Sequence, residues 1–114
     1  MSYKRTLRGV DYLIANELDF ARDEHGETFA SMHEGAAVLA EEAQEANEEA
    51  ELIHQRFNWL WADVRADNSK SAREHAEDIA SHAERLACEA IQVAAMALKF
   101  VDTVDEGEDA DTCD

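Results

Sequence analysis

The sequence contains no proline, only four glycines and only two cysteines among its 114 residues. Proline is the residue that most often ends or kinks a helix, so its absence favours long helices. Two cysteines are too few for a disulfide framework, and we expect Cys88 and Cys113 to be free thiols in a reducing compartment. No apolar run approaches the ~18 residues that a membrane-spanning helix needs. The sequence therefore predicts a cytoplasmic protein that is rich in helix.

Positive charge is also scarce. Ten Lys and Arg residues stand against 27 Asp and Glu residues, which gives a formal net charge of −17. Binding to nucleic acid or to an anionic membrane requires clustered Lys and Arg, so the composition argues against both kinds of partner. Three explanations for the acid remain open: solubility in the salt-rich cytoplasm of a halophilic organism, cation binding, or a basic protein partner. The small share of lysine among the basic residues favours the first.

Patterns typical of strands are missing, and apolar residues instead recur at helical spacing. Helices are expected at about residues 7–24, from 29 or 31 to 66, and 71–104. The second would be unusually long for a globular domain, so we expect a bend or a short break near residues 55–58. The predicted fold class is all-α, an antiparallel bundle of about three to four helices. One domain would cover residues 1–104, followed by a disordered acidic tail at 105–114.

Local signals mark the expected helix ends. Gly26 can adopt the left-handed conformation that ends many helices. The segments Ser31–Glu34 and Ser71–Glu74 both match the capping box, in which a Ser and a Glu satisfy free backbone amides. Residues 90–101 are apolar on almost every side of a helix. In a chain this short, such a helix favours completion of the bundle by oligomerisation.

Two glutamates of the second helix are expected to converge. Glu42 and Glu45 are three residues apart, on neighbouring turns along the edge of the apolar face. Like charges this close are unfavourable unless a cation compensates them, and carboxylate oxygens suit Mg²⁺ or Mn²⁺. The alternative is an ordinary solvated edge of an acidic helix.

The third helix carries a glutamate inside its apolar stripe. The stripe is formed by Leu86, Val93, Met96, Phe100 and Val104. At about 100° per residue, Glu89 falls among these side chains, where an ionised carboxylate needs a partner. That partner could be an arginine such as Arg85, a shared proton, or a metal also held by Glu42 and Glu45. Gln92, one turn on, can present an amide oxygen to the same place.

These residues resemble two short motifs of one enzyme family. The segment Glu41-Glu42-Ala43-Gln44-Glu45 is similar to the EExxE element of the MazG-like all-α nucleoside triphosphate pyrophosphohydrolases. The segment Glu89-Ala90-Ile91-Gln92 stands where that family carries its second element, ExxD. The resemblance covers roughly residues 29–104 and is closest to the short single-domain members found in phages and prokaryotes.

The resemblance implies a helical homodimer or homotetramer that hydrolyses a nucleoside triphosphate to the monophosphate and pyrophosphate with Mg²⁺, for which Mn²⁺ could substitute. Glu42, Glu45 and Glu89 would be metal ligands, and Glu41 and Glu42 would be catalytic, Glu41 as an outer ligand or as a base that orients water. Gln92 departs from the family pattern. As a metal ligand it offers oxygen without charge, which should weaken binding and leaves open a member that binds nucleotide without turnover.

Three further residues are candidates for substrate binding. Lys99 could reach a phosphate, Trp59 could stack on a nucleobase, and His33 could contact a phosphate or metal. Each has a plainer alternative: a solvent-facing lysine, an aromatic in the core or a subunit contact, and a residue at a helix start. The competing function is that of a non-catalytic acidic helical protein that binds a basic protein partner. A bundle whose acid is purely structural is a third reading.

Overall fold

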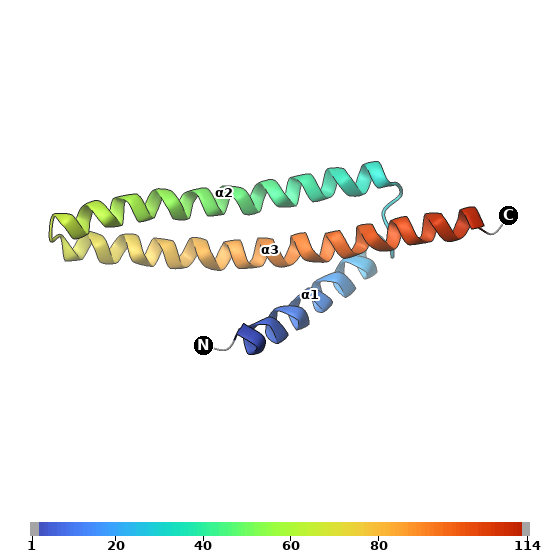
Figure 1. Cartoon of the computed structure of the whole chain (residues 1–114), viewed down its shortest axis with the longest axis horizontal. Coiled ribbons are helices and arrows are strands. Elements are labelled where there is room, and N and C mark those ends of the chain that lie inside the picture. The colour runs from blue at the N-terminus through green and yellow to red at the C-terminus, as the bar shows by residue number, and fades with distance from the viewer. Residues whose placement is uncertain (1–2, 113–114) are drawn as a thin grey trace. The chain divides into compact units, whose positions relative to one another are not determined.

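The computed structural model describes residues 3–112, with side chains described for residues 3–107 (Figure 1). Three α-helices follow one another: α1 (Tyr3–His25), α2 (Met32–Arg65) and α3 (Ser69–Thr112). Over these residues there is no strand, so the all-α prediction is confirmed. None of the described helices combines the length and the apolar character needed to cross a membrane.

The boundary between α1 and α2 follows the predicted signals. Gly26 has a φ of +92° and donates its N–H to the carbonyl oxygen of Arg22 at 2.8 Å, which ends α1. At the start of α2, the N–H of Glu34 donates to Oγ of Ser31 at 3.1 Å. This hydrogen bond is the Ser half of the predicted capping box, so Ser31 is confirmed as the N-cap.

The helix α2 ends in a Schellman motif. Asp67 adopts the left-handed conformation with a φ of +53°, and its N–H donates to the carbonyl oxygen of Val64 at 3.2 Å. The N–H of the next residue, Asn68, reaches back to the carbonyl oxygen of Asp63 at 2.9 Å. These two bonds satisfy carbonyls that would otherwise lack a partner at the end of the helix.

The start of α3 differs from the prediction. Ser71 does not cap this helix with Glu74; its own N–H donates to Oδ1 of Asn68 at 3.2 Å, and the helix begins at Ser69. Asn is as good an N-cap as Ser, so the earlier residue takes the role once the turn places it there.

Two predictions about helix length are wrong. The expected bend near residues 55–58 does not occur, and α2 is one continuous helix. Between Ala36 and Arg65 the sequence offers neither proline nor glycine, the usual causes of a kink. Helical geometry in α3 also continues past Val104 to Thr112. The division into one domain over 1–104 and a disordered tail over 105–114 stays a prediction.

The chain forms two compact units. The first comprises the residues up to Glu42 together with those from Ile91 onward, and the second comprises residues 43–90. In the first unit, Arg22 forms an ion pair with Asp102, and the N–H of Phe29 donates to Oγ1 of Thr103 at 2.9 Å. These contacts hold the last turns of α1, and the loop between α1 and α2, against α3.

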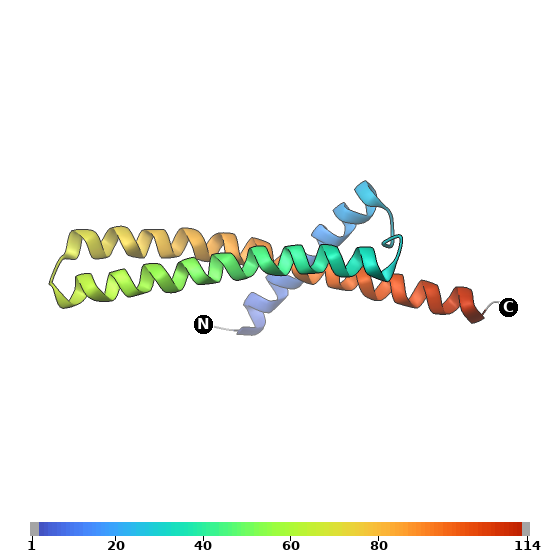
Figure 2. The same ribbon diagram turned by 90° about the horizontal axis from the view of Figure 1, so that it is seen from above.

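The second unit is a two-helix hairpin. Figures 1 and 2 both show its two segments, the later part of α2 and the earlier part of α3, side by side and antiparallel. None of its residues is classed as buried, whereas the first unit contains buried side chains such as Phe29 and Ala95. The thiol of Cys88 is free, as predicted, and the residue is exposed; Cys113 lies outside the described residues.

Candidate metal centre

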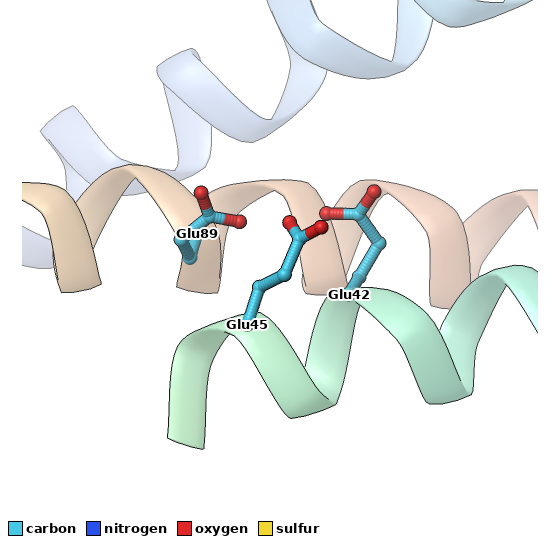
Figure 3. Close-up of side chains that lie close together, drawn as sticks. All are labelled: Glu42, Glu45 and Glu89. Carbon is cyan, nitrogen blue, oxygen red and sulfur yellow. The ribbon is translucent and has the colours of Figure 1, made fainter. Parts of the chain in front are cut away.

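Three glutamates of α2 and α3 point toward one another (Figure 3). Glu42 and Glu45 lie one turn apart on α2, and Glu89 comes from α3. One carboxylate oxygen of each lies within 4.8 Å of one oxygen of each of the others. The spacing of three residues places the first two on one face of α2, and the position of Glu89 in the stripe of α3 aims it at the same place.

The environment of this cluster makes the convergence of charge costly. Glu42 and Glu89 are half-buried and Glu45 is exposed. Oε2 of Glu89 is shielded from solvent and has no hydrogen-bond partner within the described part of the chain. A buried carboxylate oxygen without a donor loses its hydration without compensation. A divalent cation is one group that would satisfy this oxygen and offset the repulsion among the three carboxylates.

The cluster does not include every predicted acidic residue. Glu41 is exposed and, next to Glu42 on α2, falls about 100° around the helix axis from it. It is not among the carboxylates that converge in the described structure. Its role as an outer ligand or as a base stays a prediction.

A cavity in the first unit connects one glutamate of the cluster with two other predicted residues. It encloses about 550 Å³ and is lined by Glu42, Gln92 and Lys99. The remaining lining residues are Glu17, Phe20, Ala21, His25, Phe29, Glu34, Val38 and Met96. This volume lies within the range of pockets that bind small molecules. Its wall mixes apolar side chains with a few polar groups, as such pockets do.

Lys99 is the buried cation of this cavity. Only 3% of the residue is exposed, and its ammonium nitrogen lies 4.6 Å from the centroid of the Phe29 ring. The alternative of a solvent-facing lysine is therefore wrong. At a rise of about 1.5 Å per residue, Lys99 lies roughly 10 Å along α3 from Gln92. Both residues thus line one cavity, at positions about two helical turns apart along α3.

The other two substrate-binding candidates lie apart from this cavity. His33 is exposed and is not among the described residues that line it. Trp59 packs in the second unit, with its ring centroid 5.5 Å from that of His75 and 4.6 Å from the guanidinium carbon of Arg56. It follows Glu45 by roughly 21 Å along α2. A nucleobase stacked on Trp59 would therefore be far from the carboxylates of its own chain.

A series of polar pairs across the hairpin was not predicted from the sequence. Nδ1 of His82 lies 2.7 Å from Oε2 of Glu49. Further along, Arg56 pairs with Asp78 at 3.5 Å and His75 lies 3.8 Å from Asp63. A signal for them exists in the sequence, because Glu42, Glu49, Arg56 and Asp63 are spaced by seven, as are His75, His82 and Glu89. Residues spaced by seven lie on one face of a helix.

A comparison of the chain with known protein families, with curated proteins and with solved structures finds no match.

Proposed function

We propose that the chain is a Mg²⁺-dependent nucleoside triphosphate pyrophosphohydrolase of the MazG-like kind, which acts as a homodimer or homotetramer. The observation that carries the proposal is the convergence of Glu42, Glu45 and Glu89 to within 4.8 Å, from the two segments that resemble the family motifs. A donor set made of carboxylate oxygens, one of them buried without a hydrogen bond, fits a hard divalent cation such as Mg²⁺ or Mn²⁺.

The three glutamates would hold the cation through their carboxylates. Bound there, Mg²⁺ would neutralise charge on phosphate oxygens and lower the pKa of a coordinated water. Gln92, one turn after Glu89 on α3, lines the adjoining cavity and offers an amide oxygen as an acceptor and an amide NH₂ as a donor. It therefore suits a ligand of mixed polarity better than it suits a strongly charged metal site.

Lys99 would bind and orient the substrate. Its buried ammonium group lines the same cavity as Glu42, so it can donate to a phosphate oxygen of a nucleotide held near the carboxylates. The apolar part of the wall, which includes Phe29 and Met96, offers a surface for the nucleoside. Water is displaced from such a surface on binding, which strengthens the interactions of charged groups nearby.

Calorimetric titration with Mg²⁺ and Mn²⁺ at high salt tests the metal site. Binding is expected for the parent protein and should be lost in Glu45→Gln and in Glu89→Gln, which remove charge without changing shape. The matched control is Glu51→Gln, since Glu51 is exposed, lies about 120° around the axis of α2 from Glu45 and about 180° from Glu42, and accepts a hydrogen bond from Asn47. Release of pyrophosphate from a panel of nucleoside triphosphates then tests the reaction and identifies the preferred base and sugar.

Three outcomes separate the competing functions. Metal binding with pyrophosphate release supports the enzyme. Metal binding without release supports a protein that holds nucleotide without turnover. An absence of metal binding in the parent protein removes the enzyme and favours the non-catalytic acidic protein with a basic partner.

A further inference from the structure

The part of α2 within the second unit carries a heptad pattern. Seven of its apolar residues are spaced alternately by three and four, which is the spacing of positions a and d in a coiled coil. The a positions are Ala43, Ala50, Phe57 and Val64, and the d positions are Ala46, Ile53 and Leu60. We call these seven residues the α2 seam. A seam of this kind calls for a second helix along its whole length.

The helix α3 of the same chain covers only one flank of the seam. The residues that precede the a positions, Glu49 and Arg56, turn toward α3 and pair with His82 and Asp78. Three of the four a positions, Ala43, Phe57 and Val64, stay exposed, with Phe57 51% exposed and Val64 47% exposed, and Ala50 is half-buried. Since the hairpin has no buried residue of its own, it needs a further partner to remove this apolar surface from water.

We propose that a second copy of the chain covers the α2 seam, with the two α2 helices antiparallel about a two-fold axis. The seam is uneven in size: its first half is alanine, and its second half holds the large residues. An antiparallel pair places Phe57 against Ala46 of the partner subunit, Ile53 against Ala50 of the partner subunit, and Leu60 against Ala43 of the partner subunit. A parallel pair would crowd Phe57 against its own copy and leave the alanine half loosely packed.

Charge favours the same orientation. Residues 43–51 contain Glu45, Glu48, Glu49 and Glu51 and no basic residue, whereas residues 52–65 contain Arg56 and Arg65 against Asp63. In the antiparallel pair the acidic half of one helix lies along the basic half of the other. A parallel pair would place the two acidic halves side by side.

A second copy is the partner that this surface fits, because the seam complements itself. Every copy exposes the same surface, and a two-fold interface uses the same patch on both subunits. The seam also belongs to the second unit, which holds Glu45 on α2 and Glu89 on α3, so its stability and theirs are linked. The inference does not depend on the reaction proposed above, since it would stand if no nucleotide were hydrolysed.

Sedimentation equilibrium of the full chain tests the interface. The parent protein is expected to be a dimer or a multiple of it, and Phe57→Glu should weaken the dimer by more than roughly 100-fold, because a symmetric interface carries the change twice. Tyr12→Glu, at an aromatic on α1 that is 67% exposed, should leave the mass unchanged. A monomeric parent, or a Phe57→Glu dimer of unchanged strength, would overturn the proposal.

Folding of the hairpin and its association could be coupled, so a second measurement avoids the disruptive variant. For an obligate dimer the midpoint of thermal unfolding rises with protein concentration. We expect this rise for the parent protein, and a midpoint independent of concentration would count against the interface.

Disulfide trapping tests the orientation, in a background where Cys88→Ser and Cys113→Ser remove the native thiols. A mixture of Ala46→Cys and Phe57→Cys chains should form a crosslink between the two variants. Ala46→Cys alone should not, since its two copies would be about 16 Å apart along the pair, beyond the reach of a disulfide. A crosslink of Ala46→Cys with itself, and none in the mixture, would show that the helices are parallel.

Discussion

The ammonium nitrogen of Lys99 lies 4.6 Å from the centroid of the Phe29 ring. Both residues are buried, with Lys99 3% exposed and Phe29 7% exposed. Taking an ammonium group out of water is costly, and the face of an aromatic ring offsets that cost only in part. Because the same residue lines the cavity with Glu42 and Gln92, an anionic ligand in the cavity would supply the rest. We therefore predict that Lys99 binds an anion in this cavity.

Lys99→Met keeps the length and apolar stem of the side chain and removes its charge. The loss of a charge-assisted hydrogen bond to phosphate, about 1.5–3 kcal/mol, should raise the KM for the nucleotide by roughly 10–100-fold. The melting temperature should stay the same or rise, since a buried charge disappears. Lys70→Met is the control, because Lys70 is exposed in the first turn of α3. An unchanged KM for Lys99→Met would assign Lys99 a purely structural part.

Gln92→Asp introduces the aspartate of the ExxD element and adds a carboxylate one turn after Glu89. Without metal, the additional negative charge near Glu42, Glu45 and Glu89 should lower the melting temperature measured in a chelator. With Mg²⁺, the fourth carboxylate should raise the affinity by several-fold and increase the thermal stabilisation by the cation. The sign of the change is therefore opposite in the two conditions. A variant that loses stability equally in both would speak against a cation among these residues.

Gly35 marks a close approach inside the first unit. A Cβ atom built on it would lie 2.6 Å from Cδ2 of Phe100 and 2.8 Å from Cδ2 of Phe29, too close for either ring. Gly35→Ala should therefore lower the free energy of unfolding by about 1–3 kcal/mol, although alanine is the better helix former. Gly9→Ala, with open space around it, should raise that free energy by up to about 1 kcal/mol. Urea denaturation of the two variants measures both, and a stabilised Gly35→Ala would contradict the packing.

The sequence predicts helices and their faces well because a single period governs both. The convergence of Glu42 and Glu45 follows from their spacing on one helix, and the inward position of Glu89 follows from the stripe around it. What periodicity does not contain is the alignment of one helix against another. The pairs of Glu49 with His82 and of Arg56 with Asp78 depend on where the hairpin turns.

The predicted N-cap of α3 is wrong for a related reason. Asn68 and Ser71 are both good N-caps, and the choice between them is made by the backbone of the preceding residues, where Asp67 turns into the left-handed region. A local pattern cannot rank two equivalent signals that lie within one turn of each other. The same limit applies to Trp59, whose helix was predicted but whose distance from the carboxylates follows only from an unbroken α2.

Asp67→Gly tests the turn. Asp67 holds a φ of +53° at the end of α2, a conformation that costs a residue with a Cβ atom about 1 kcal/mol and costs glycine almost nothing. Both hydrogen bonds of the turn come from the backbone of Asp67 and Asn68, so the substitution leaves them in place. We therefore expect the free energy of unfolding to rise by about 0.5–1 kcal/mol. Asn68→Ala removes the cap of α3 and should lower it by about 1 kcal/mol, so the two neighbours should change stability in opposite directions. If both variants lost the same free energy of unfolding, the chain would turn elsewhere. The register of α2 against α3 would then differ, and the approach of Glu89 to Glu45 depends on that register.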